Sequence, residues 1–131
     1  AVFNIKVIDI LKPRINNFKD LISQAQPFYN DPKIYDENDK LKAWSDLSVN
    51  TIISDLRSTL SQVYDWNEDL IENQIKNFSK EKDIPLKKII MPLRYLIFGN
   101  LKGPSLFTSI ALIGRKTIIN RINLALKTFK F

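Results

Sequence analysis

The chain has 131 residues, 44% of them hydrophobic, which is enough for one folded domain with its own core and excludes intrinsic disorder. It contains no Cys and no His, which excludes disulfides, thiolate nucleophiles, zinc sites with the usual ligands and imidazole bases. The formal net charge is +6, but residues 34–75 carry −6 and residues 76–131 carry +10. A basic C-terminal half is typical of a phosphate-binding surface, although a solvated basic face would give the same charge.

The sequence carries no membrane or secretion signal. No run of about 18 apolar residues is present, which predicts no membrane span, and a cytoplasmic location is the default expectation. The N-terminal residues 1–11 are too short and too charged for a signal peptide, and the missing initiator Met favours a fragment of a longer protein. A monomer is the default expectation for the oligomeric state.

Residues 4–26 repeat apolar side chains every three or four positions, which predicts a helix. Pro13 either kinks this helix or starts a second one, and the uninterrupted apolar stripe favours one kinked helix. Residues 27–40 are rich in Pro, Asn and acidic side chains and are predicted to form a loop. The acidic cluster at Asp36 could suggest a cation site, but it lacks the Gly and distal Glu of a calcium loop. An acidic turn that starts a helix is therefore favoured.

The next helix is predicted from Val49 to residue 64, where the spacing of three and four is clear, with Ser45 or Ser48 as its cap. Trp44 could be a platform for base stacking. It precedes a helix in an acidic region that repels phosphates, so we assign it to the core.

Residues 65–84 are predicted to form a helix capped by Asp65 or Asn67. Glu68 and Glu72 could be proposed as paired catalytic carboxylates. Glutamates four residues apart at a helix start are more often simply exposed, and nothing indicates a perturbed pKa. We therefore assign no catalytic residue and no metal ligand.

Residues 91–126 are the most informative stretch. Three apolar runs with helical spacing predict three short helices joined by two tight turns. The three glycines of the chain fall where runs end, as helix C-terminal caps do: Gly99, Gly103 and Gly114. Pro92 is expected to break or restart the preceding helix, Pro104 suits the first turn of a new one, and a final helix is predicted from Arg115 to about Phe129.

These elements predict an all-α fold, a compact bundle of short helices joined by tight Gly/Pro turns. We expect a first helical part over residues 1–64 and a C-terminal helical part over residues 65–131.

The order and spacing of several short elements resemble the C-terminal end of bacterial-type glutamyl-tRNA synthetases, which are class I aminoacyl-tRNA synthetases. The elements are Pro92-Leu93-Arg94, Gly99, Gly103-Pro104-Ser105-Leu106-Phe107, Leu112-Ile113-Gly114-Arg115 and Arg121-Ile122-Asn123-Leu124-Ala125-Leu126. Upstream, Leu11-x-x-Arg14 followed by Phe18-Lys19-Asp20-Leu21 and then Pro27-Phe28-Tyr29 is similar to the helix that opens the anticodon-binding region of this family.

The resemblance implies that the chain is the anticodon-binding region of a synthetase. The family's catalytic signatures, a His-containing ATP-binding motif and a Lys-Ser-rich loop, do not occur in this sequence, so the chain alone should not aminoacylate. The parent enzyme would be an ATP-dependent glutamate–tRNA ligase using Mg²⁺, whereas this part needs no cofactor. The implied partner is tRNA(Glu), and whether tRNA(Gln) is also bound stays open.

The resemblance also implies which residues meet the anticodon bases. In the family these are the Arg of the Pro-Leu-Arg element and the turn after the next Gly, which correspond here to Arg94, Gly103, Pro104 and Leu106; Arg14 is a further candidate. Arg94 could instead be a solvent-facing or ion-paired residue, and Leu106 could equally belong to the core. Family members often carry Ser or Thr where Gly103 stands, so a hydroxyl contact available to them is missing here.

The physical chemistry fits these assignments. An arginine offers a planar pair of donors to a base edge, and a tight turn exposes backbone groups that can read unstacked loop bases. Basic side chains near the turn would bind phosphates without reading sequence. These are Lys87, Lys88, Lys102, Arg115 and Lys116. The alternative function is a helical protein-interaction module whose basic surface is incidental.

Overall fold

The computed structural model describes residues 2–129, and all regular structure in this range is helical, which confirms the all-α prediction. The elements are α1 (Val2–Leu11), a 3₁₀ turn (Lys12–Arg14), α2 (Phe18–Tyr29), α3 (Glu37–Ala43), α4 (Leu47–Ser61), α5 (Glu68–Lys82), α6 (Lys87–Phe98), α7 (Leu106–Ile113) and α8 (Arg115–Thr128). Within the described range, no helix is both long enough and apolar enough to cross a bilayer.

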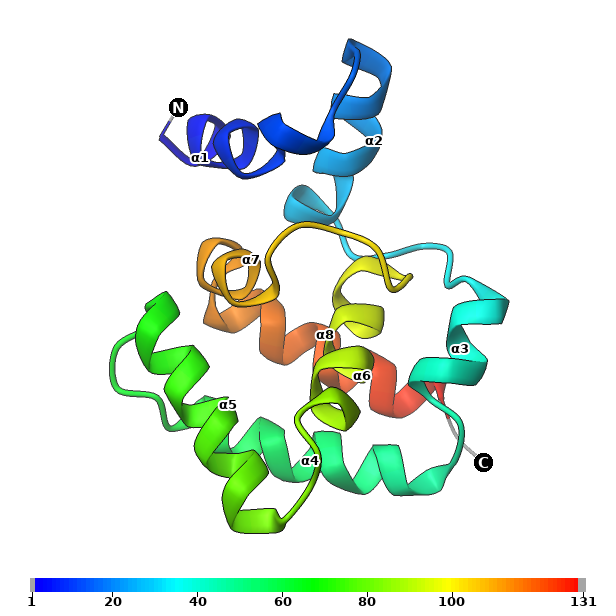
Figure 1. The fold of residues 1–131 in the computed structure, drawn as a ribbon, viewed down its shortest axis with the longest axis vertical. Coiled ribbons are helices and arrows are strands. Elements are labelled where there is room, and N and C mark those ends of the chain that lie inside the picture. The colour runs from blue at the N-terminus through cyan, green and yellow to red at the C-terminus, as the bar shows by residue number, and fades with distance from the viewer. Residues whose placement is uncertain (1, 130–131) are drawn as a thin grey trace.

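The last helix lies in the middle of the molecule. Helix α8 contacts α4, α6 and α7, while α5 packs against α4 and α7, and α3 packs against α6. Helices α1 and α2 pack on each other at one end of the molecule, at the top of Figure 1, and reach the remaining helices through α7.

An aromatic cluster forms part of the core where α8 ends. The ring centroid of Phe129 lies 5.0 Å from those of Tyr35 and Trp44 and 5.6 Å from that of Tyr95. Trp44 is 1% exposed and its Nε1 donates to Asn50 Oδ1 at 2.9 Å. The assignment of Trp44 to the core is therefore confirmed.

The single kinked helix expected over residues 4–26 is wrong. Pro13 lies in the 3₁₀ turn, and the chain becomes extended at Ile15. Asn17 then starts α2 by accepting a hydrogen bond from the Asp20 backbone N–H at 2.9 Å. The apolar stripe continues across the break because α1 and α2 pack on each other as a helical hairpin. A continuous stripe therefore could not distinguish one helix from two.

Side-chain caps at the starts of α3 and α4 test the predicted helix starts, confirming one and correcting the other. Asp36 caps α3 by accepting from the Asp39 N–H at 2.8 Å, which confirms the acidic turn that starts a helix. The cap of α4 is Asp46 rather than Ser45 or Ser48, since its Oδ1 accepts from the Ser48 N–H at 2.8 Å. The predicted loop is shorter than expected, because α2 runs through residue 27 to residue 29.

The C-terminal stretch contains the three predicted helices, but its first connection differs. Helix α6 runs through Pro92, so the predicted break there is wrong; the proline removes one backbone donor, and packing in the core maintains the helix. Gly99 and Gly114 are C-caps as expected, whereas Gly103 lies inside a loop over residues 99–105 and caps no helix. Helix α7 starts at residue 106, with Ser105 as its N-cap residue. Pro104 therefore lies in the loop before the helix and not, as predicted, in its first turn.

Residues 30–36 connect α2 to α3, and we call them the anchored linker because buried groups hold it at both ends. Arg121 of α8 is 1% exposed and donates to Asp31 Oδ1 at 2.9 Å and to the Asn30 carbonyl at 2.9 Å. Its third bond reaches the Ile97 carbonyl of α6 at 3.0 Å. At the other end, the backbone N–H of residue 36 donates to the Gly99 carbonyl at 2.8 Å.

Tyr95 of α6 also holds the anchored linker, since its hydroxyl donates to the Asp36 carbonyl at 2.9 Å. Burial, and then the nearby carboxylates of Glu37, Asp36 and Asp39, raise the pKa of Tyr95 to about 12. A phenolate here would lose its hydration and would be repelled by these groups. The neutral phenol is therefore the form that the folded state stabilises.

Candidate nucleic-acid interface

A pocket of about 240 Å³ lies between α2 and the loop over residues 99–105, and we call it the Gly103 pocket. One wall comes from the 3₁₀ turn and α2, and the other from the end of α6 and the following loop. Its lining residues are Arg14, Ser23, Gln24, Pro27, Phe98, Asn100, Lys102, Gly103 and Pro104. Four of the predicted RNA-binding residues therefore meet at one site, although they lie in two distant parts of the sequence.

Arg94 supports the loop wall of the pocket from α6. Its Nη1 donates to the Pro104 carbonyl at 2.8 Å, and its guanidinium carbon lies 5.9 Å from the ring centroid of Phe98. Arg94 is half-buried, and burial, followed by the positive charge of Arg14, lowers its pKa. An arginine stays protonated despite such a shift, so Arg94 and Arg14 both bring positive charge to this pocket. This arrangement concentrates positive potential where an anionic ligand could enter.

Gly103 lets the loop approach Arg94 closely. Its φ of +136° is rarely adopted by other residues, and a Cβ at this position would lie 3.2 Å from Arg94 Nη1 and 3.3 Å from Phe98 Cδ2. Leu106 is 4% exposed and contributes to the core, which agrees with the core interpretation of this residue. Any contact of Leu106 with RNA stays a prediction.

Residues 3–126 match the family described as the anticodon binding domain. The chain belongs to this family. It is 33% identical over 117 residues to the glutamate–tRNA ligase of Prosthecochloris aestuarii, covering 89% of this chain and 23% of that protein. It is 28% identical over 125 residues to that of Christiangramia forsetii, covering 95% and 25% of the two proteins.

Solved structures agree with the sequence comparison. A glutamate–tRNA ligase from Elizabethkingia meningosepticum superposes with a TM-score of 0.91 at 30% identity, covering 99% of this chain and 26% of that one. The synthetase of Elizabethkingia anophelis gives a TM-score of 0.83 at 28% identity, covering 97% and 24%. The chain thus spans about a quarter of the length of the relatives it matches, and its fold is that of an anticodon-binding domain of glutamate–tRNA ligases.

The five predicted phosphate contacts of this anticodon-binding domain lie in three separate places. Lys102 is exposed and lines the Gly103 pocket. Lys87 and Lys88 lie at the start of α6, at the opposite end of the helix from the Gly103 pocket. They line a second cavity, of about 490 Å³, together with residues of α3 and α4. Arg115 and Lys116 begin α8.

Arg115 is engaged in contacts within the domain. Its Nη1 donates to the Ser61 carbonyl at 3.2 Å, its Nη2 donates to the Val63 carbonyl, and its guanidinium lies 5.3 Å from the ring centroid of Trp66. These contacts tie the start of α8 to the connection between α4 and α5. The neighbouring Lys116 is exposed. The geometry therefore favours a structural role for Arg115 and leaves Lys116 as the side chain that a phosphate could reach.

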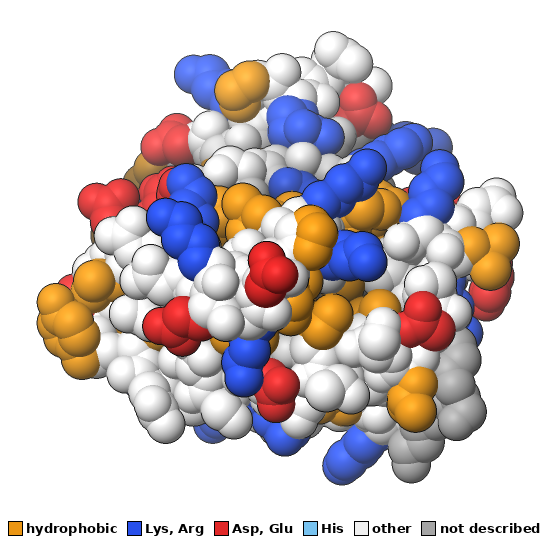
Figure 2. Space-filling view, turned by 60° about the horizontal axis from the view of Figure 1, so that its bottom comes forward, with side chains coloured by type: hydrophobic (Ala, Val, Ile, Leu, Met, Phe, Trp, Pro, Cys, Tyr) orange, Lys and Arg blue, Asp and Glu red, His pale blue; other side chains and the backbone are white. Residues whose placement is uncertain are grey.

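The basic side chains of the domain do not form one uniform patch. Figure 2 shows a face with hydrophobic side chains across its middle, Lys and Arg side chains above them and along the lower edge, and Asp and Glu side chains spread over the whole face. Because the positive charge is not continuous, an anionic ligand must be recognised at particular pockets as well as by the net charge of the domain.

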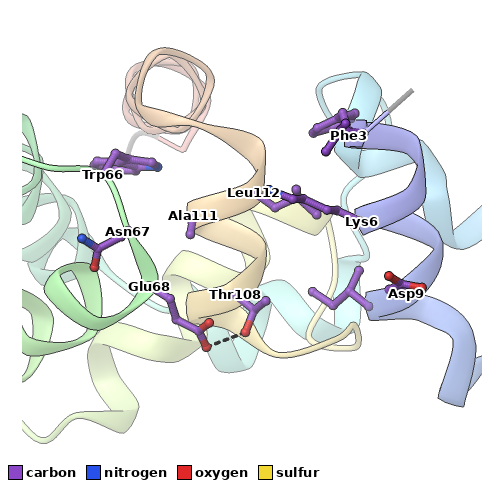
Figure 3. A pocket seen from close by; sticks show the side chains of 11 residues that line it. Phe3, Lys6, Asp9, Trp66, Asn67, Glu68, Thr108, Ala111 and Leu112 are labelled. Carbon is purple, nitrogen blue, oxygen red and sulfur yellow. Dashed lines mark hydrogen bonds between the residues drawn. The ribbon is translucent and has the colours of Figure 1, made fainter.

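A larger groove, of about 720 Å³, lies on another part of the domain, between α1, the start of α5 and α7 (Figure 3). Its apolar lining includes Phe3, Trp66 and Leu112. At its edge Glu68 accepts a hydrogen bond from Thr108 Oγ1 at 2.6 Å, shown as a dashed line in Figure 3.

The glutamates of α5 do not act as a pair. Glu72 lies one turn after Glu68 and pairs with Lys76 at 2.6 Å, so the two carboxylates have different partners. Among residues 2–129, no three acidic side chains converge as a metal site would require.

Sequence reasoning missed the α2 wall of the Gly103 pocket. Ser23 and Gln24 had no motif to mark them, and Pro27 belonged to the resembling upstream element without any role assigned to it. The pairing of this wall with residues 98–104 exists only once the α1–α2 hairpin has docked. Arg121 was part of the resembling C-terminal element, but only the fold shows it as the buried arginine that holds the anchored linker.

Proposed function

We propose that this chain recognises the anticodon loop of a glutamate tRNA, and that it positions the tRNA for aminoacylation by a catalytic domain elsewhere in a longer glutamate–tRNA ligase. The observation that carries the proposal is the Gly103 pocket, which is lined by Arg14, Lys102 and the loop residue Gly103, and whose loop wall is supported by Arg94 through the Pro104 carbonyl. Membership of the anticodon binding domain family and the names of the relatives support the same function.

In this proposal some residues recognise the bases and others bind the phosphates. Arg94 is already fixed by the Pro104 carbonyl and loses little freedom on binding, so its remaining donors can read a base edge. Backbone groups of Gly103 add contacts to an unstacked base, while the Pro104 carbonyl holds Arg94 in place. Lys102 and Arg14 attract the loop phosphates without regard to sequence. Lys87, Lys88 and Lys116 would contact phosphates farther from the anticodon.

The proposal extends to the parent protein. The chain would be one helical region of a larger synthetase, with residues 1–64 and 65–131 as its two helical parts, and ATP and Mg²⁺ would be needed only by the absent catalytic domain. The protein would work as a monomer in the cytoplasm. Whether it serves tRNA(Glu) alone or also tRNA(Gln) would depend on the base-reading surface.

The test is a titration of the 131-residue chain with three labelled stem-loops, carrying a glutamate, a glutamine or an unrelated anticodon, at low and moderate salt. We expect tighter binding to the glutamate loop. Replacing Arg94 with Ala should cost roughly 1–3 kcal/mol and reduce the base preference. Equal binding to the glutamate and glutamine loops, above the unrelated one, would indicate a parent that serves both tRNAs.

A protein-docking function has one observation in its favour, the apolar groove of Figure 3. A chain that docks a protein there would show no preference among the three loops and little dependence on salt. That outcome of the titration would replace the anticodon proposal with this second function.

A further inference from the structure

The Gly103 pocket continues into a second cavity along α2. The second cavity has a volume of about 400 Å³ and shares four lining residues with the Gly103 pocket: Ser23, Pro27, Phe98 and Asn100. The two cavities are therefore adjoining halves of one groove. The first half carries Arg14 and Lys102, and the second half is completed by α2 and the anchored linker.

The second half rests on a rigid support. The anchored linker is held at one end by Arg121, through the side chain of Asp31 and the carbonyl of Asn30, and at the other by Gly99 and Tyr95. The charge of Asp31 is paired with that of Arg121, with 2.9 Å between Oδ1 and Nε. The carboxylate in this half of the groove is thus compensated and presents a weaker barrier to an anionic ligand.

Ile34 is an exposed apolar residue on this support. It lines the second half of the groove and is 84% exposed, although the backbone on either side of it is fixed. Exposing an isoleucine contributes nothing to folding, and burying it against a ligand would be favourable. Lys33 beside it is exposed and offers a cation. On α2, Gln26 Oε1 accepts from Asn30 Nδ2 at 2.9 Å, which orients the Gln26 amide.

We propose that this second half is a subsite for a second nucleotide of single-stranded RNA, adjacent in the loop to the nucleotide in the Gly103 pocket. Ile34 packs on the face of its base, and Lys33 pairs with its phosphate. The oriented Gln26 amide lies within the same half to meet a base edge. This inference rests on the proposed anticodon-binding function and adds a subsite to it.

The test pairs protein variants with RNA variants. The RNAs are stem-loops with an intact glutamate anticodon loop or with one abasic nucleotide at each loop position in turn. The protein variants are Ile34→Ser, Arg94→Ala and the control Leu41→Ser, which alters an apolar residue of α3 that is 75% exposed. Because both serine substitutions change exposed positions, thermal unfolding should stay close to that of the unmodified chain.

We expect Ile34→Ser to weaken binding of the intact loop about five- to tenfold, the loss of part of one buried isoleucine, and Leu41→Ser to leave it unchanged. The loss should vanish for one abasic loop, and that position should neighbour the one at which the effect of Arg94→Ala vanishes. Unchanged binding by Ile34→Ser, or equal losses on every abasic loop, would overturn the subsite.

The two proposals fail in different ways. If the unmodified chain shows no preference for the glutamate anticodon but Ile34→Ser loses affinity in the position-specific manner, the subsite stands and the anticodon assignment falls. If the chain prefers the glutamate loop and Ile34→Ser binds as well as the unmodified chain, the anticodon assignment stands and the subsite is wrong. A chain that binds no stem-loop overturns both.

Discussion

The close approach of Gly103 to Arg94 can be tested with a matched pair of glycine substitutions. Gly103 and Gly114 both have positive φ, +136° and +101°. A Cβ on Gly103 would lie 3.2 Å from Arg94 Nη1, whereas a Cβ on Gly114 would meet nothing within 4 Å. Alanine at either position therefore strains the backbone, but only Gly103→Ala also forces the Arg94 guanidinium to shift by a few tenths of an ångström.

The expected loss of stability is similar for the two variants. Backbone strain of this kind costs about 1–3 kcal/mol, and the smaller entropy of an unfolded chain with Ala offsets about 0.4–1 kcal/mol. The net loss is then about 1–2 kcal/mol. At about 2.1 cal/mol/K per residue, this corresponds to a fall in Tm of about 4–7 °C for a chain of this length.

The effect on RNA binding should separate the variants. Gly103→Ala should weaken binding of the glutamate stem-loop by about tenfold, because the moved Arg94 loses its fixed geometry. Gly114→Ala should bind as the unmodified chain does at a temperature where both are folded. Thermal unfolding followed by circular dichroism and fluorescence titration provide the two measurements. Equal losses of binding in both variants, or full binding by Gly103→Ala, would refute the reasoning.

Three further predictions concern single side chains. The pKa of Tyr95 is raised to about 12 in the folded state. The stabilisation of the folded state by the neutral phenol is therefore fully present below pH 10 and is lost as the pH rises toward 12. The free energy of unfolding should fall by about 2–3 kcal/mol over this range in denaturant titrations, and Tyr95→Phe should flatten the fall. Arg121→Met should cost about 2–4 kcal/mol in denaturant unfolding, because the buried Ile97 carbonyl and the part-buried Asn30 carbonyl lose their donor. Asp31→Asn, at a half-exposed site, should cost under about 1 kcal/mol. Lys102→Ala should weaken all stem-loops alike and reduce the slope of log K against log salt by about 1; a selective loss for one loop would contradict its role as a phosphate contact.

The helices were predicted well where the spacing of apolar residues and the local signals for the helix ends point to the same range. Asn67 caps α5 by accepting from the Leu70 N–H at 2.9 Å, and α8 spans nearly the predicted range, because apolar spacing and capping groups act within a few residues. The break after Pro13 was missed because the same apolar stripe serves one helix or a hairpin of two. The course of α6 through Pro92 was missed because packing in the core outweighs the loss of one backbone hydrogen bond.

The candidate site was predictable only in part. The loop residues and Arg94 lie close together in sequence, and the resemblance to a known family placed them. Their partners on α2 and the anchored linker come from segments far away, and no periodicity indicates which helix will cover a given loop. The electrostatic effect of Arg14 on Arg94, and the burial of Arg121, likewise exist only through tertiary packing.

The central position of α8 bears on how the protein is made. The helix is synthesised after the elements that it joins, and Phe129 follows it to complete the ring cluster with Tyr35, Trp44 and Tyr95. While the nascent chain still holds α8 inside the ribosome, the apolar faces of α4, α6 and α7 have no partner to cover them. Stable folding of this region therefore has to wait until α8 has left the ribosome, and until then its unfinished core is a surface that chaperones would encounter.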